Sequence, residues 1–74
     1  ELNVLKGAKE TLAKYHPQLF IEINDKNLKA KGGSAKELID FLLNLNYQIL
    51  HAETDESINL NFNFANKHFD IIAT

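Results

Sequence analysis

The sequence predicts an α/β fold in the order helix, strand, helix, strand, a strand that the pattern leaves open, and a last strand that can return antiparallel. Apolar residues recur at helical spacing in 5–15 and 34–45, and short apolar runs stand at 19–23, 47–51 and 69–73. The first two strands and the helix between them make a βαβ unit of about 35 residues, and such units are right-handed with parallel strands in nearly all cases. No clear helix precedes the last strand, so this strand can return antiparallel.

The first helical segment is interrupted by a glycine. Its apolar positions lie three and four residues apart, at Leu5, Ala8, Leu12 and Tyr15. Glycine in a helix interior costs about 1 kcal/mol relative to alanine, so we expect two short helices that meet at Lys6 and Gly7. His16 should end the segment, because a residue before proline is pushed out of the helical region.

The first strand and the segment after it contrast in composition. Leu19–Ile23 is apolar except for Glu22, a composition typical of a strand that is buried on both faces. Asn24–Gly33 is polar and rich in lysine, so we predict a loop. This segment ends with Gly32 and Gly33. The pair lacks the spacing of a nucleotide-binding loop, so we interpret it as a flexible break between two elements.

The second helix carries signals at both ends. Ser34 is the expected N-cap, and Glu37 three residues later completes a capping box, in which each side chain accepts from a free backbone amide. Asn46 is expected to take the left-handed conformation that ends the helix. The predicted apolar face consists of Ala35, Leu38, Ile39, Leu42 and Leu45, with Phe41 beside it.

The region between the strands predicted at Tyr47–His51 and Phe69–Ala73 has a period of two. Ile58, Leu60, Phe62 and Phe64 alternate with Asn59, Asn61 and Asn63. This alternation indicates a half-buried strand, although asparagine is a poor strand former. Two interpretations stay open: an edge hairpin with Tyr47–His51, or a loop that places its apolar side chains in the core.

Composition narrows the class of protein and its partners. Eight lysines stand against ten carboxylates with no arginine, so the net charge of −2 offers no basic stripe, and no nucleic acid partner is expected. No apolar stretch approaches the roughly 20 residues that span a bilayer, so we expect no membrane partner and, by default, a cytoplasmic protein.

The chain lacks methionine and cysteine and opens inside a helical pattern. Residues 1–74 are therefore interpreted as a single partial domain of a longer protein.

Several stretches resemble one family. These are Glu1-Leu2-Asn3-Val4-Leu5-Lys6-Gly7-Ala8 with Leu12 and Tyr15, then Pro17–Ile23, Leu38–Leu42, Asn46-Tyr47 and Phe69–Ala73. The first block and the Pro17–Ile23 block closely resemble the residues that follow an Asp-Val-Glu-Gly signature in the FkbM family of S-adenosylmethionine-dependent methyltransferases. The later stretches look like the carboxy-terminal pattern of that family.

The resemblance implies the carboxy-terminal half of a class I, Rossmann-like methyltransferase sheet, whose seventh strand runs antiparallel between its neighbours. Leu19–Ile23 then corresponds to strand five, Tyr47–His51 to strand six and Phe69–Ala73 to strand seven. The parent protein is implied to be an O-methyltransferase for a hydroxyl of a sugar or small metabolite, with this segment as sheet edge and substrate wall. S-adenosylmethionine is expected to bind residues outside the segment, so the segment alone should be inactive.

The end of the first strand holds the leading site candidates. Ligands of open α/β sheets bind beyond the carboxyl ends of parallel strands, which is where Glu22, Asn24 and Asp25 lie. All three are substrate-binding candidates, and Glu22 is also a catalytic candidate, since its carboxylate could orient a substrate hydroxyl for methyl transfer. The competing interpretation of Glu22 is an inward-pointing carboxylate bonded to a backbone amide or a lysine. For Asn24 and Asp25 the competing interpretation is structural, because Asn and Asp are common where a strand passes into a loop and their side chains bond nearby backbone amides.

Other polar residues carry weaker indications. His51, at the end of the second strand, is a second catalytic candidate as a general base near neutral pH. A metal site built from the histidines has no ligand-spacing motif behind it, so none is predicted. The lysines at 26, 29, 31 and 36 could attract an anionic substrate, but a solvated loop explains them equally well.

A second class of function stays open. A non-enzymatic α/β interaction module could complete its sheet by pairing with another chain, because unpaired strand edges are templates for such pairing. A homo-oligomer formed through a sheet edge is the simplest case.

Overall fold

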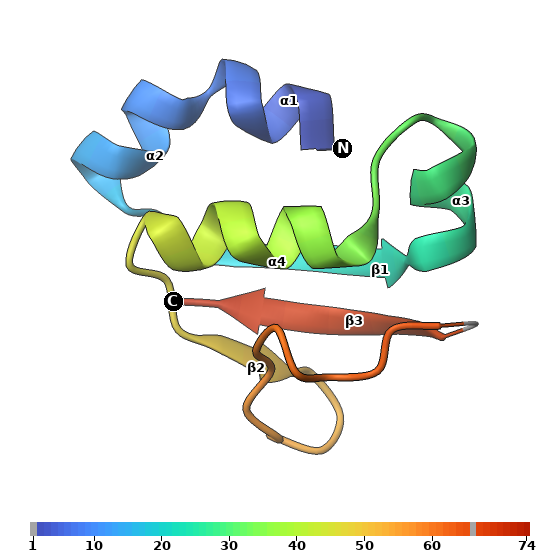
Figure 1. Cartoon of the computed structure of the whole chain (residues 1–74). Helices are drawn as coiled ribbons and strands as arrows, with labels where there is room; N and C mark the ends of the chain where they lie inside the picture. Colours follow the sequence, from blue (N-terminus) through green and yellow to red (C-terminus); the bar gives the residue numbers. More distant parts are fainter. Residues whose placement is uncertain (1, 66) are drawn as a thin grey trace.

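The chain folds into one sheet with its helices on a single side (Figure 1). The structure, a computed structural model, describes residues 2–65 and 67–74, with side chains from Leu5 onward. The elements are α1 (Leu2–Gly7), α2 (Lys9–Tyr15), β1 (Leu19–Asn24), α3 (Asp25–Ala30), α4 (Ala35–Asn44), β2 (Ile49–His51) and β3 (His68–Ala73).

The last strand lies in the middle of the sheet. The strand order is β1-β3-β2, and β3 pairs antiparallel with both neighbours. The antiparallel return predicted for the last strand is therefore confirmed. Since β1 and β2 each oppose β3, they run parallel to each other, as a βαβ unit requires. β2 is shorter than the predicted range of 47–51 and starts at Ile49.

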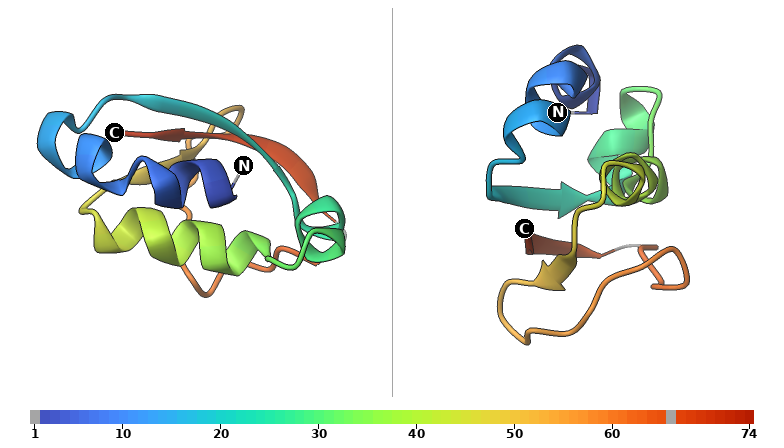
Figure 2. Two further views of the ribbon diagram at one scale, coloured as in Figure 1. Left: turned by 90° about the horizontal axis from the view of Figure 1, so that it is seen from above. Right: turned by 90° about the vertical axis from the view of Figure 1, so that its left-hand side faces the viewer.

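The core forms between the sheet and α4. Figure 2 shows α4 along one face of the sheet, with α1 and α2 on the same side. Ile23, Ile71 and Ala73 from the strands and Leu38, Ile39 and Leu42 from α4 are fully buried. The predicted apolar face of α4 is confirmed, since Ala35 is also buried and Phe41 and Leu45 are partly buried against the core.

The prediction that the first strand is buried on both faces is wrong. Ile21 and Ile23 point into the core, whereas Phe20 is 69% exposed and Glu22 points to solvent. Side chains alternate across a strand, and the described helices cover only one face. Phe20 therefore lies on the open face, in register with Ile72 of β3.

The predicted loop at Asn24–Gly33 contains a helix, α3, instead. The Asn24 side chain accepts from the backbone amide of Asn27 and caps its start. Gly32, at a φ of +88°, ends it: the Gly32 amide donates to Lys29 O and the Gly33 amide to Leu28 O. These two bonds are a Schellman motif, which needs a left-handed residue where Gly32 stands. The glycine pair is thus a helix stop.

The strand predicted at 58–64 is absent from the described residues, and the loop alternative is confirmed. The Asn59 side chain accepts from the Asn61 amide, and the Asn63 side chain accepts from the Ala65 amide. These local bonds bend the backbone into turns and compete with strand pairing. Ile58 and Phe64 are nevertheless buried, so the loop places apolar side chains in the core.

The first two helices meet at Ala8, one residue beyond the predicted junction, and α2 ends at Tyr15 before His16. His16 leaves the helix in a left-handed conformation, at φ 46° and ψ 54°. Its ring stacks on Tyr47 with a centroid distance of 4.0 Å, and the Tyr47 hydroxyl donates to Pro17 O at 2.7 Å. Tyr47 thereby joins the end of α4 to the turn before β1.

Both predicted ends of α4 are found. The Ser34 hydroxyl oxygen accepts from the Glu37 amide at 3.1 Å, which is the N-cap half of the capping box. At the other end Asn46 has a φ of 67°. The Asn46 amide donates to Leu43 O and the Tyr47 amide to Leu42 O, a second Schellman motif.

Substitutions of Asn46 test this helix end. Asn46→Ala should lower the free energy of unfolding of the full-length protein by about 1–2 kcal/mol, because a Cβ-bearing side chain without local hydrogen bonds is strained in the left-handed region. Asn46→Gly should be neutral or slightly stabilising. Urea unfolding of the two variants checks both values, and equal stability of the two would contradict the assigned conformation.

Candidate functional site

Polar side chains gather where β1 ends and two helices begin. β1 runs directly into α3, and a turn at 31–34 leads from α3 into α4 (Figure 1). The carboxyl end of a parallel strand is where open α/β sheets bind ligands. The structure therefore places the predicted candidates Glu22, Asn24 and Asp25 at this end, but on different sides of the sheet.

Asp25 connects β1 to α4. Its side chain is buried, accepts from the Ala35 amide at 2.8 Å and pairs with the Lys29 ammonium at 3.1 Å. The bond from Ala35 lowers the pKa of Asp25 below its ordinary value of 3.8; burial opposes this shift and Lys29 adds to it. Because the folded pKa is the lower one, the ionised carboxylate stabilises the fold above pH 3.8, and this stabilisation is lost as the pH falls through the folded pKa.

Glu22 is oriented toward solvent. Its carboxylate lies 3.2 Å from Nε2 of His68 on β3, and both side chains are more than half exposed. The structure thus contradicts the inward-pointing alternative. Glu22 also lines a hollow of about 30 Å³ with Asn24, Asn27, Leu28 and Lys31, which has room for a water molecule or two but not for a metabolite.

His51 lies apart from Glu22. In the register of the sheet it pairs with Ile71 and is level with Ile21, whose side chain faces the core. Its ring stacks on Phe69 at 4.9 Å, and its Nδ1 accepts from the Glu53 amide. Glu22 pairs with Asp70, one position further along β3, so it points to the opposite face. The two catalytic candidates do not form one constellation.

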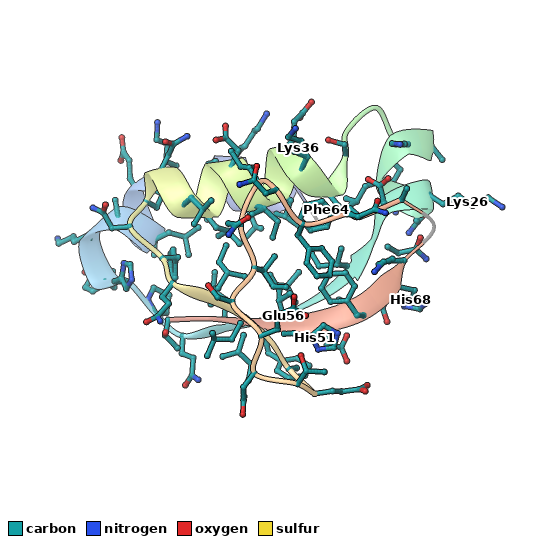
Figure 3. The ribbon with its side chains drawn as sticks, turned by 60° about the horizontal axis from the view of Figure 1, so that its bottom comes forward. Lys26, Lys36, His51, Glu56, Phe64 and His68 are labelled. Atoms are coloured by element: carbon teal, nitrogen blue, oxygen red, sulfur yellow. The ribbon has the colours of Figure 1, made fainter. Side chains whose placement is uncertain are left out.

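A larger groove lies on the helical side of the sheet, between the start of α4 and the loop after β2. It comprises two adjoining hollows of about 300 and 320 Å³ that share Ser34, Lys36 and Leu60. We call it the α4 groove. Figure 3 shows Lys36 extending outward from α4 and Phe64 on the loop pointing into the body of the molecule; both residues line the hollow of about 300 Å³. Its lining residues are Asp25, Lys29, Ser34, Lys36, Glu37, Asp40, Leu60, Phe62, Asn63, Phe64 and Ala65.

Aromatic packing holds the loop wall of this groove in place. Phe62 contacts both Phe64 and Phe69, at centroid distances of 5.1 and 5.3 Å. The Lys67 ammonium lies 5.0 Å from the Phe62 ring, within the range of a cation–π interaction. Since Phe69 belongs to β3, these contacts fasten the loop to the sheet.

Within residues 2–65 and 67–74 no three histidine, cysteine or carboxylate side chains cluster to hold a metal ion. Among the described helices, none has both the length and the apolar character to cross a membrane.

The sequence-based prediction missed the loop side of the groove. The alternation of Leu60, Phe62 and Asn63 left a strand and a loop open, and it gave no indication that these residues line a groove beside α4. Of the candidates, Asp25 lines the α4 groove, whereas Glu22 and Asn24 line the small hollow. A signal was available in the loop length, because segments beyond roughly 12–15 residues without secondary structure are commonly functional or disordered.

The described residues form a small α/β unit with a three-stranded sheet and with polar side chains at the end of β1. Residues 1–49 match the model of the methyltransferase FkbM domain, and the chain belongs to this family. The match ends at the first residue of β2, so β3 and the loop wall of the groove lie beyond it. Comparison with curated proteins and with solved structures gave no match.

Asp25 variants test the link between β1 and α4. Asp25→Ala should cost the full-length protein about 1–3 kcal/mol of stability, because it leaves the buried Ala35 amide without an acceptor. Lys29→Gln, which removes only the exposed partner of the ion pair, should cost less than about 1 kcal/mol. Urea unfolding near neutral pH measures the stability of both variants. Equal losses of stability would contradict our view that the hydrogen bond from the Ala35 amide contributes more than the ion pair with Lys29.

Proposed function

We propose that this chain is the carboxy-terminal part of an S-adenosylmethionine-dependent O-methyltransferase that acts on a hydroxyl of a sugar or small metabolite. The observation that carries the proposal is the FkbM domain match over residues 1–49. The strand arrangement supports it, because β3 runs antiparallel between β1 and β2. On this proposal β1, β3 and β2 are strands five, seven and six of a class I methyltransferase sheet.

The open parts of the sheet support the proposal of a partial domain. In the described sheet β1 is an edge strand, and the face that carries Phe20 and Ile72 has no helix over it. An exposed edge and a large exposed aromatic side chain are typical of a surface that another part of a protein covers. We propose that preceding strands and helices of the same domain cover them.

The described residues do not fit the cofactor. A nucleotide-type cofactor site needs a glycine-rich turn directly after a strand, whereas Gly32 and Gly33 end α3. Bound S-adenosylmethionine would supply the methyl group, held by residues outside this segment. The contribution of this chain is then the acceptor side of the reaction.

Positioning is the chemistry that this chain can supply. Methyl transfer depends mainly on holding the acceptor oxygen in line with the methyl group. The exposed carboxylate of Glu22 can accept a hydrogen bond from an acceptor hydroxyl, and His68 at 3.2 Å restrains that carboxylate. Asn24 lines the same hollow, although its side chain oxygen already caps α3.

One observation favours the second candidate function, an interaction module. The unpaired edge of β1 together with Phe20, 69% exposed, could dock a second chain, including another copy. The residues before Glu1 discriminate the two functions. A strand that ends in Asp-Val-Glu-Gly and follows a glycine-rich turn supports the methyltransferase.

Cofactor binding tests the leading proposal directly. The full-length protein should bind S-adenosylmethionine in isothermal titration calorimetry, whereas residues 1–74 alone should give no binding heat. Binding by the short segment would contradict our assignment of the cofactor site to residues outside it. Absence of binding by the full-length protein would contradict the methyltransferase proposal itself.

The proposed role of Glu22 requires a variant that keeps its shape. Glu22→Gln should lower kcat on the order of tenfold, the effect of losing about 1.4 kcal/mol of transition-state stabilisation, with stability within about 1 kcal/mol. His68→Gln is the matched control, since it removes the same ion pair and leaves the carboxylate. Equal activity loss in both variants would assign the effect to the ion pair between Glu22 and His68, and not to a hydrogen bond between Glu22 and the acceptor hydroxyl.

A further inference from the structure

The two edges of the sheet differ. β3 lies in the middle, so β1 and β2 are the edge strands of the described sheet. No described segment pairs with the outer edge of β1, whereas the chain itself covers the outer edge of β2. The cover is residues 53–58, which we call the edge turn. In Figure 1 the chain after β2 turns at the bottom of the view, on the side of β2 away from β3.

Backbone hydrogen bonds fasten the edge turn to β2. The His51 amide donates to Glu56 O at 2.8 Å. The Ile58 amide donates to Ile49 O, and the Asp55 amide donates to His51 O, both at 2.9 Å. In an edge strand of an antiparallel sheet, alternate residues bond to the neighbouring strand and the others point outward. The outward-pointing groups of β2 that a further strand would use are therefore bonded within the chain.

The edge turn is held in shape by local contacts and by an anchor in the core. The Glu56 amide donates to the Thr54 hydroxyl oxygen at 3.2 Å. Asp55 has a φ of 60°, in the left-handed region that aspartate tolerates better than most residues do. Ile58, at the end of the turn, is only 1% exposed. The turn thus has a defined conformation against the strand.

We propose that the edge turn blocks self-association: it occupies the hydrogen-bonding edge of β2 and prevents a second copy of the chain from pairing there. Exposed strand edges are templates for pairing between chains, and natural proteins cover or charge them. The sheet then extends only at β1, whether the parent protein is a methyltransferase or an interaction module.

A second copy is the partner that an uncovered β2 would meet. Bonds between this region and β3 run from Gln48 to Ala52, so the strand available to a partner is longer than Ile49–His51. Most homodimers are built around a two-fold axis, which places the same segment of both copies face to face. Antiparallel pairing of β2 with its own copy has this symmetry and would join the two sheets into one.

The charge of the edge turn acts in the same direction. Glu53, Asp55 and Glu56 are exposed, and residues 53–58 contain no lysine. Around a two-fold axis the carboxylates of two edge turns would approach each other and repel. Charged side chains at a sheet edge are a common protection against pairing.

Variants of Asp55 open the turn without a change in the core. Proline cannot adopt the φ of 60° and has no amide hydrogen for His51 O, so Asp55→Pro should release the edge turn. Asp55→Gly is the matched control, because it loses the same carboxylate but keeps the amide and accepts the left-handed conformation. If circular dichroism shows that Asp55→Pro is unfolded, Asp55→Val replaces it, since a β-branched residue is strained at this φ.

Two measurements on the full-length protein report the result. At low concentration, hydrogen exchange of the His51 amide should be faster in Asp55→Pro than in Asp55→Gly, because Glu56 O no longer protects it. In sedimentation velocity, Asp55→Pro should dimerise with a dissociation constant at least about tenfold below that of the unmodified protein, since the fraction of chains with an open edge sets the apparent affinity. In that dimer the amides of β2 should be protected again.

The other outcomes contradict the proposal. Faster exchange in Asp55→Pro without additional dimer would overturn the blocking role. Unchanged exchange would overturn the fastening of the turn through Asp55, and equal dimerisation of Asp55→Gly would assign the effect to the lost carboxylate and not to the backbone cover. A dimer in which the amides of β2 exchange as fast as in the monomer would place the contact elsewhere and overturn the proposed surface.

Discussion

The hydrogen bond from the Ala35 amide to the buried carboxylate of Asp25 is the contact on which the site depends. It joins the end of β1 to the first turn of α4 at 2.8 Å, across ten residues of chain. Without it, the start of α4 would keep an unsatisfied amide in a buried setting, which costs about 1–3 kcal/mol. Ser34 and Lys36 stand on either side of Ala35, so this bond helps to hold both beside the end of β1.

The two faces of the sheet have different tasks. The face toward α4 is filled by the core, and it continues at the end of β1 into the α4 groove. The opposite face carries Phe20 and Glu22 and has no described helix over it. In the proposed methyltransferase domain, preceding elements cover the open face around Phe20, and Glu22 meets the acceptor where β1 ends.

Much of the fold could be predicted from local patterns, because those patterns act within one or two turns of chain. Ser34 and Asn46 delimited α4 correctly, since caps depend on residues three to five positions away. α3 was missed although its signals were present: Asn24 as cap, Asp25 and Lys29 at helical spacing, and Gly32 as stop. Its high polarity concealed them. The strand at 58–64 was wrong because side chains of Asn59 and Asn63 bond their own backbone.

By itself the sequence determined the helix ends, the apolar face of α4, the antiparallel last strand and the resemblance to FkbM methyltransferases. Each of these depends on neighbouring residues or on a motif. Only the tertiary structure decided which candidates share a site. Strand alternation and the register with β3 place Glu22 and His51 on opposite faces, and aromatic contacts bring Phe62 of the loop opposite Lys36 of α4. Such pairings arise from packing between distant segments, which spacing along one chain does not encode.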